Sequence, residues 1–140
     1  MISIFIIEDD RNLQELYLLL LQEHFQEVIR IASNGLEAIE KYKNFSEKPE
    51  VIIMDHRMPL MDGMQAMLEI LKIDPNASII FVSADSAVEK TAVLKGAELF
   101  ICKPMNIQHL IEAINKVLIR KKSESSKVSS SKKLGENQLN

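Results

Sequence analysis

The chain has 140 residues, which is enough for one domain with a well-formed core and too few for two. Its formal net charge is −3, but residues 121–140 hold five lysines and two glutamates, so the first 120 residues are acidic and the last twenty are basic. The sequence has no run of about 18 apolar residues, the length that a helix needs to cross a membrane. The opening MISIFIIEDD lacks the basic start of a signal peptide, and the single cysteine excludes an internal disulfide. We therefore expect a cytoplasmic protein that contacts no membrane and does not bind DNA directly.

Five short apolar runs alternate with helical patterns along the first 120 residues. The runs, rich in β-branched side chains, are residues 2–7, 28–32, 51–54, 78–82 and 99–102. The helices are expected at about 11–24, 35–45, 63–73, 87–95 and 107–119. Such alternation with short connections predicts an α/β fold in which helices cover both faces of a parallel sheet. Of the few topologies that right-handed crossovers allow, we expect a flavodoxin-like, doubly wound domain with strand order 2-1-3-4-5.

Helix boundaries and inner faces follow from capping residues and apolar spacing. Asp10, Asn34, Asp62, Ser86 and Asn106 are the expected N-caps, two of them with a glutamate three residues on, and Gly96 ends the fourth helix. The expected inner faces are Leu13, Leu16, Tyr17, Leu20 and His24; Leu36, Ile39 and Tyr42; Met64, Met67, Leu68 and Leu71; and Ile107, Leu110, Ile111, Ile114, Val117 and Leu118. Residues 121–140 are rich in Ser and Lys and are expected to form a disordered basic tail outside a domain of residues 1–120.

Charged and hydroxyl side chains stand where the predicted strands end. They are Glu8, Asp9 and Asp10 after the first strand, Asp55 after the third, Ser83 after the fourth and Lys103 after the fifth. These strand ends open on one edge of the sheet, where the carboxylates repel one another. Lys103 and a hard divalent cation such as Mg²⁺ can relieve this repulsion, whereas zinc is disfavoured because thiolate and imidazole ligands are absent there. The acidic turn EDDRN would repel a dinucleotide or flavin phosphate, so what remains is the equipment for forming an aspartyl phosphate.

Four motifs in register at these strand ends carry a family resemblance. IIEDD, MDHRMPLMDG, FVSAD and FICKP resemble the signatures of the response-regulator receiver domain over about residues 1–120. The resemblance implies a stand-alone regulator of two-component phosphorelay signalling that has no output domain. It also implies a regulator that is not an enzyme in the ordinary sense, since it catalyses only its own phosphorylation and dephosphorylation.

The resemblance also implies a role for each acidic residue. Asp55 would be the phosphoacceptor. Mg²⁺ would be bound by Asp9 and Asp55 directly, by Glu8 through water and by the backbone carbonyl of Arg57. Asp10 would be a third acid of the pocket or only a helix cap.

The remaining site residues are assigned in the same way. Ser83 would hydrogen-bond a phosphoryl oxygen and Lys103 would bind the phosphate. Phe100 would be the aromatic switch partner of Ser83, and Pro104 would follow a cis peptide bond. Arg57 and Asp85 flank the site, at positions that in this family tune how fast the phosphoryl group is lost, and an ion pair between them that shields the pocket from water is one hypothesis.

The implied partners are a histidine kinase or histidine phosphotransfer protein as phosphoryl donor and a downstream protein target that the sequence does not name. The activated form would change the surface of the fourth helix, fifth strand and fifth helix. Leu18 and Leu19 lie off the inner face of the first helix and are a candidate contact for the donor. His56 and Cys102 are expected to be structural, Cys102 as a small buried hydrophobe.

Two other function classes remain open. A non-phosphorylated interaction scaffold could use the fold alone, although a scaffold has no need for carboxylates that repel one another. A phosphatase of the aspartyl-phosphate kind is disfavoured because Arg57 stands where a second aspartate would follow the nucleophile.

Overall fold

The computed structural model describes residues 2–25 and 27–138 as five strands and their connecting helices. The strands are β1 (Ile2–Ile7), β2 (Glu27–Ala32), β3 (Val51–Asp55), β4 (Ile79–Ser83) and β5 (Leu99–Cys102). The helices are α1 (Arg11–His24), α2 (Gly35–Asn44), α3 (Gly63–Ile73), the 3-10 turn η1 (Ser86–Val88), α4 (Glu89–Lys95) and α5 (Ile107–Gln138). The strands pair in parallel in the order β2-β1-β3-β4-β5, which confirms the predicted flavodoxin-like topology.

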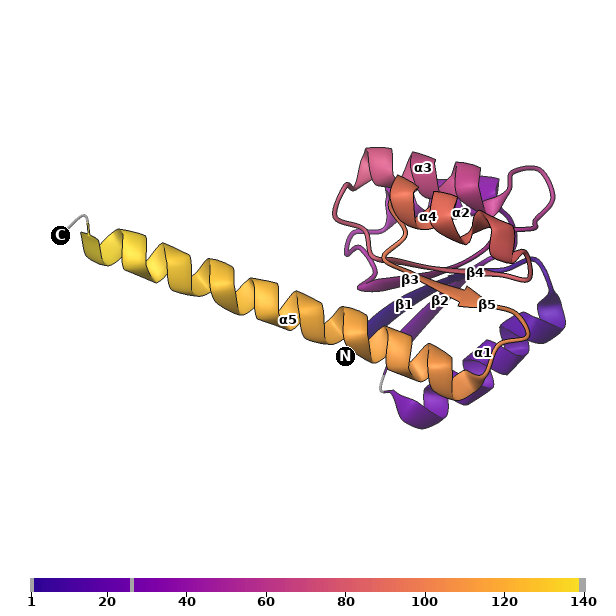
Figure 1. Cartoon of the computed structure of the whole chain (residues 1–140), viewed down its shortest axis with the longest axis horizontal. Coiled ribbons are helices and arrows are strands. Elements are labelled where there is room, and N and C mark those ends of the chain that lie inside the picture. The colour runs from indigo at the N-terminus through magenta and orange to yellow at the C-terminus, as the bar shows by residue number, and fades with distance from the viewer. Residues whose placement is uncertain (1, 26, 139–140) are drawn as a thin grey trace.

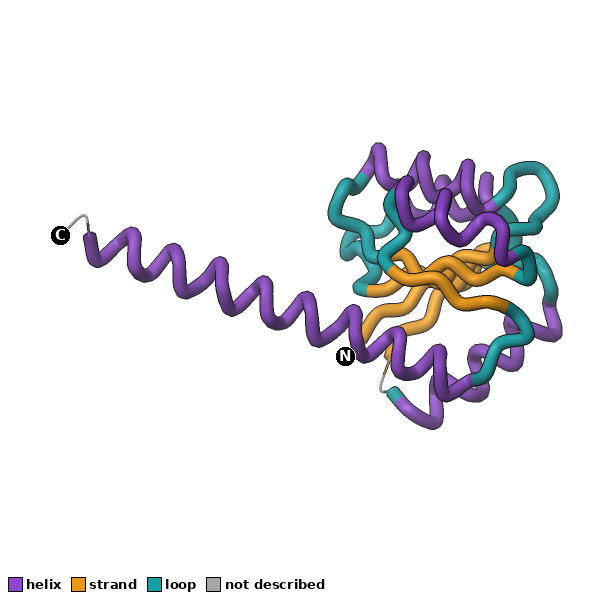
Figure 2. The backbone as a smooth tube through the Cα atoms, in the orientation of Figure 1, coloured by secondary structure: helices purple, strands orange, loops and turns teal. Residues whose placement is uncertain are grey.

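Helices cover both faces of the sheet. Figure 1 shows α2, α3 and α4 on one side and α1 and α5 on the other, and in Figure 2 the strands run enclosed between these two layers. All five residues of β3 and all five of β4 are buried, so these strands read as continuous apolar runs instead of alternating ones. This is why five short runs of apolar residues were enough to predict a parallel sheet.

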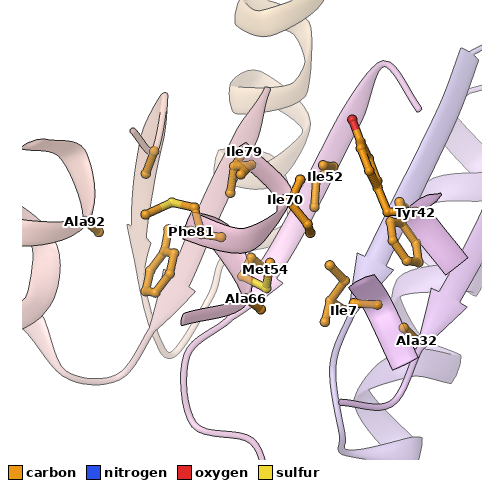
Figure 3. Packing of buried hydrophobic residues seen from close by; sticks show 14 residues of the cluster. Ile7, Ala32, Tyr42, Ile52, Met54, Ala66, Ile70, Ile79, Phe81 and Ala92 are labelled. Carbon is orange, nitrogen blue, oxygen red and sulfur yellow. The ribbon is translucent and has the colours of Figure 1, made fainter. Parts of the chain in front are cut away.

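The core on the α2–α3–α4 side combines large strand residues with both small and large helix residues, among them Ala38, Tyr42, Ala66 and Met67. Phe81, Met54 and Ile52 point from the sheet toward Ala66 and Ile70 of α3 (Figure 3). Small side chains let the helix axes approach the sheet closely, and the strand side chains then fill the space between them.

The expected inner faces are therefore partly wrong. Leu16 and Leu36, which were expected to face the core, are 46% and 49% exposed. Ala38 on α2 and Ala66 and Ile70 on α3 are fully buried instead, so the buried stripes include residues, two of them alanines, that the apolar spacing did not select.

Most helix caps lie where the sequence places them. The Asp10 carboxylate accepts hydrogen bonds from the backbone N–H groups of Asn12 and Leu13, and Asp62 forms a complete capping box with Gln65. Ser86, however, is not the cap that was expected. The chain first makes η1, whose start is capped by Asp85 accepting from Ala87 N at 3.0 Å.

The last helix differs most from expectation. α5 does not end near residue 119 but continues to Gln138 and projects away from the sheet (Figure 1). Residues 121–138, expected to be disordered, are thus helical in the structure. No proline interrupts this stretch, and Arg120 and Glu124 form an ion pair of 2.8 Å at i,i+4, a spacing that supports a helix.

Within residues 2–25 and 27–138, no helix combines the length and the apolar character that crossing a bilayer requires.

Candidate functional site

The carboxyl ends of β1, β3 and β4 and the loop after β5 surround an acidic pocket of about 250 Å³. Its lining is Glu8, Asp9, Asp10, Leu13, Asp55, Arg57, Ser83, Ala84 and Lys103. The structure therefore brings together all the strand-end residues that the sequence singled out.

The loop that follows Asp55 packs closely against the backbone of this residue. Asp55 ends β3 and is only 7% exposed. Gly63 donates its backbone N–H to the carbonyl of His56 at 2.7 Å, and a Cβ at position 63 would lie 2.1 Å from the backbone oxygen of Asp55. Only glycine fits this approach, so Gly63 fixes the loop and thereby the direction of the Asp55 carboxylate.

Lys103 is the cation that contacts the buried acids. Its Nζ lies 2.8 Å from Asp55 Oδ1 and 3.4 Å from Glu8 Oε1. The Lys103–Pro104 peptide bond is cis, as the resemblance implied.

The electrostatics of the pocket are unbalanced. Burial, together with the nearby charge of Asp55, raises the pKa of Glu8 to about 8. Burial opposes the charge of Lys103, but its hydrogen bond to Asp55 and the charges of Asp55 and Glu8 prevail and raise the pKa of the ammonium. Lys103 therefore stays charged, whereas Glu8 retains a proton near neutral pH when no other cation is present.

Three carboxylates form a set that fits a hard cation. One oxygen from each of Glu8, Asp9 and Asp55 lies within 4.8 Å of the others. Glu8 is buried, at 2% exposure, while Asp9 is exposed and accessible to an ion from solvent. An all-oxygen donor set on the rim of a small pocket suits Mg²⁺, which keeps several water ligands. Arg57 lines the same pocket, and Asp10 lines it while its carboxylate caps α1.

Ser83 lies on the other side of Asp55. It is 2% exposed, and its hydroxyl accepts a hydrogen bond from the backbone N–H of Asp85 at 3.0 Å. Arg57 Nη2 stands 4.0 Å from Asp85 Oδ2, at the outer limit of an ion pair, and the Arg57 side chain is 81% exposed. The predicted Arg57–Asp85 contact is thus present but loose.

The aromatic and cysteine positions on β4 and β5 have separate outcomes. Phe100 is half-buried, and its ring stacks on Phe81 with centroids 6.1 Å apart and 18° between the planes. Cys102 is exposed, so the expectation that it is buried was wrong: it is the last residue of β5 and lines a groove with Phe100 and Pro104. His56 packs against Phe81 at 5.5 Å, in keeping with a structural role.

Sequence reasoning missed a residue that supports the first acidic loop. Gln14 Nε2 donates to the backbone carbonyl of Glu8 at 2.5 Å and to Ser33 Oγ at 3.2 Å. Its position one turn after the Asp10 cap was an available signal, because that face of α1 must look back toward the end of β1.

Comparison with known proteins gives the same picture of the chain. The family model of the response regulator receiver domain matches residues 4–115. The chemotaxis protein CheY of Bacillus subtilis is 39% identical over 117 residues, covering 82% of this chain and 96% of that protein. CheY of Thermotoga maritima is 48% identical over 93 residues, covering 65% and 76%.

Solved structures agree in fold. A receiver domain protein from Clostridium thermocellum superposes with a TM-score of 0.81 at 28% identity, covering 87% of this chain and 98% of that one. The Borrelia burgdorferi CheX–CheY–BeF3–Mg²⁺ complex matches with a TM-score of 0.76 at 28% identity, covering 84% and 89%. With the pocket, the topology and a family model spanning most of its length in agreement, this chain belongs to the response-regulator receiver domain family.

Proposed function

We propose that this receiver domain takes a phosphoryl group from a phosphohistidine onto Asp55, and that the product changes which protein the domain binds or passes the phosphoryl group on. One observation carries the proposal: the Asp55 carboxylate lies 2.8 Å from the Lys103 ammonium and within 4.8 Å of the carboxylates of Glu8 and Asp9. A nucleophile, a fixed cation and a cluster suited to a metal thus converge in one small pocket.

The chemical step is a displacement at phosphorus. An oxygen of Asp55 forms the new P–O bond as the P–N bond of the donor histidine breaks, and the leaving imidazole nitrogen keeps the electron pair and takes up a proton. Bound Mg²⁺ would supply positive charge beside the transferring oxygens. Lys103 would move from the carboxylate of Asp55 toward a phosphoryl oxygen, and Ser83 would donate its hydroxyl to another. In a separate hydrolytic step, water would attack the same phosphorus as the P–O bond to Asp55 breaks, releasing inorganic phosphate and restoring the carboxylate. The domain would therefore act only on its own phosphoryl group.

The effect of phosphorylation would reach the binding surface through β4 and β5. Ser83 ends β4, and Phe100 on β5 stacks on Phe81 of β4. If the phosphoryl group draws Ser83 inward, the space beside Phe100 changes and the surface of α4, β5 and α5 follows as a shift of population. The partners would be a histidine kinase or histidine phosphotransfer protein on one side and a downstream protein on the other.

The relatives support this proposal. The Borrelia burgdorferi neighbour is a CheY in complex with CheX, BeF3 and Mg²⁺. Thermotoga maritima TrrA, which matches with a TM-score of 0.75 at 32% identity over 84% of this chain and 99% of that one, is a complex with Mg²⁺ and BeF. Both are chains of this fold that bind a metal together with a phosphoryl mimic.

Labelling tests the proposal directly. The protein is incubated with a small phosphodonor such as acetyl phosphate and Mg²⁺, and the mass of one added phosphoryl group is followed with time. The wild type should be labelled, the Asp55→Asn variant should not, and label should vanish when EDTA replaces Mg²⁺. Asp62→Asn is the matched control, because asparagine caps a helix as well as aspartate does and residue 62 lies outside the pocket. Equal labelling of Asp55→Asn, or no labelling of the wild type, would overturn the proposal. The remaining alternative would then be a non-phosphorylated interaction scaffold.

A beryllofluoride-dependent pull-down then identifies the partner. A protein retained by the wild type with beryllofluoride and Mg²⁺, but not without them and not by Asp55→Asn, is a target of the activated state.

A further inference from the structure

Arg120 of α5 makes an unusually complete set of contacts. Its Nε and Nη2 donate to the two carboxylate oxygens of Glu98 at 2.8 and 2.7 Å, and Nη2 also donates to Ser78 Oγ at 2.9 Å. Its Nη1 pairs with Glu124 at 2.8 Å, one turn further along the helix. The guanidinium thus contacts three residues, and its bidentate pair with Glu98 is a geometry that lysine could not reproduce.

These contacts join α5 to the starts of two strands. Ser78 immediately precedes β4 and Glu98 immediately precedes β5, and Glu98 N donates to the carbonyl of Ile79 at 2.8 Å. Ser78 is only 1% exposed, so its hydroxyl has little access to solvent and depends on Arg120 for a partner. The network lies at the amino end of the sheet, opposite the acidic pocket, and the proposed phosphotransfer does not use it.

Apolar packing of α5 stops just before this network. Leu110, Ile114 and Val117 are fully buried, whereas Ile119 is exposed. Lys121 continues the same inward stripe and donates through Nζ to the backbone carbonyl of Glu50. Among the residues whose side chains the structure describes, Arg120 and Lys121 make the last hydrogen bonds from α5 to the sheet side of the domain.

Beyond Lys121 the helix has little intrinsic stability. Residues 121–138 contain six serines, which are mediocre helix formers, and Figure 1 shows this segment projecting away from the domain. A free helix of this length is marginal in water because it must first form a costly nucleus. A segment that continues an existing helix avoids that cost, provided that the junction is held.

We propose that Arg120 is the clamp that holds residues 121–138 as a continuation of α5. When Arg120 is tied to Glu98 and Ser78, the last turn on the domain is fixed and helix propagates outward. When these contacts are lost, the helix ends near residue 119 and the basic segment becomes a flexible chain. The fold therefore contains a junction that decides whether the segment with the five lysines of residues 121–138 is a helix or a flexible chain.

Amide hydrogen exchange on the full chain, read by mass spectrometry, tests this proposal. Arg120→Gln should lower the protection of amides in residues 121–138 about tenfold or more, the effect of losing charge-assisted hydrogen bonds. Protection of β1 and β3 should not change. Lys122→Gln is the matched control, because Lys122 lies two residues after Arg120, is exposed, and has a helix propensity close to that of glutamine, so the change removes one positive charge and little else.

Glu98→Gln is the second variant, and it keeps Arg120 in place while removing the charge that holds it. Glu98→Gln should reproduce part of the loss of amide protection in residues 121–138. It tests the clamp independently in case Arg120→Gln perturbs the sheet. Equal protection of residues 121–138 in wild type, Arg120→Gln and Glu98→Gln would overturn the clamp. So would a wild-type segment that exchanges as fast as an unstructured peptide, or an equal loss in Lys122→Gln.

Discussion

Two clusters of charged residues stand at opposite ends of the same sheet and differ in how their charges are matched. At the carboxyl end, Glu8 and Asp55 contact Lys103, and Asp9 joins these two acids around a pocket of about 250 Å³. At the amino end, Arg120 forms ion pairs with Glu98 and Glu124, and its hydrogen bond to Glu98 raises its pKa.

The difference shows how a reactive cluster is distinguished from a structural one. At the amino end the guanidinium and the carboxylates satisfy one another. At the carboxyl end the pKa of Glu8 rises to about 8, because a buried acid beside Asp55 is not fully compensated by Lys103. An excess of negative charge that strand ends hold in place suits a site to take up a cation, and in the proposed function that cation would offset the charge of the phosphoryl group.

Removing the cation from each end should give the largest contrast. Lys103→Met should slow labelling by acetyl phosphate about 100-fold or more, the usual cost of losing one preorganised group that stabilises developing charge. Arg120→Met should change the labelling rate by less than about twofold. Rates are followed by mass spectrometry at saturating Mg²⁺, and similar losses in both variants would contradict the distinction between the two ends.

The pH dependence of Mg²⁺ binding should sharpen the comparison. Below about pH 8 Glu8 holds a proton that a metal must displace, so the affinity should rise about tenfold per pH unit from pH 6 and level off above pH 8. Isothermal titration calorimetry at pH 6, 7 and 8 measures this, and Glu8→Gln should give a flat profile. Equal affinities at pH 6 and 8 in the wild type would contradict the raised pKa.

The same raised pKa affects stability without metal. The folded protein holds the Glu8 proton more tightly than the unfolded chain does, so the free energy of unfolding should fall as the pH rises from about 4.5 toward 8.

Ser83 and Ser78 offer a comparison within one strand. Both hydroxyls are buried, one at the last residue of β4 and the other just before its first. Ser83→Ala should slow labelling about tenfold, the value of one hydrogen bond to a charged oxygen, while Ser78→Ala should leave the rate unchanged and lower the melting temperature instead. Parallel labelling and thermal unfolding of the two variants check this, and a labelling defect in Ser78→Ala would contradict it.

The smallest effect is expected at the rim of the pocket. The Arg57–Asp85 pair is long and exposed, so Asp85→Ala should shorten the lifetime of the phosphoryl group only about two- to threefold. The lifetime is read from loss of label after the phosphodonor is removed. An unchanged lifetime would mean that the pair does not shield Asp55 from water.

The carboxyl end of the sheet could be predicted from sequence, and the amino end could not. Asp55, Ser83 and Lys103 each follow an apolar run, and parallel topology alone brings such strand ends together. Arg120 and Ser78 are 42 residues apart and carry no shared local pattern, so their contact depends on where α5 crosses the sheet.

The misplaced helix faces have a related physical cause. Apolar periodicity gives weight to large side chains such as Leu36, whereas close contact between a helix and a sheet selects small ones such as Ala38 and Ala66. Composition likewise predicted disorder beyond residue 120, because the segment has too few apolar residues to bury. Composition says nothing about the neighbouring chain, and here the segment continues a helix that is already formed.

The projecting part of α5 converts a small tilt at its base into a larger displacement at its tip. Residues 121–138 extend about 27 Å at 1.5 Å per residue, roughly the width of a small domain. A tilt of about 5° at the base would displace the tip by about 2 Å over that length. A spectroscopic label placed at Gln138 would therefore magnify rearrangements of the sheet that are too small to detect at the sheet itself.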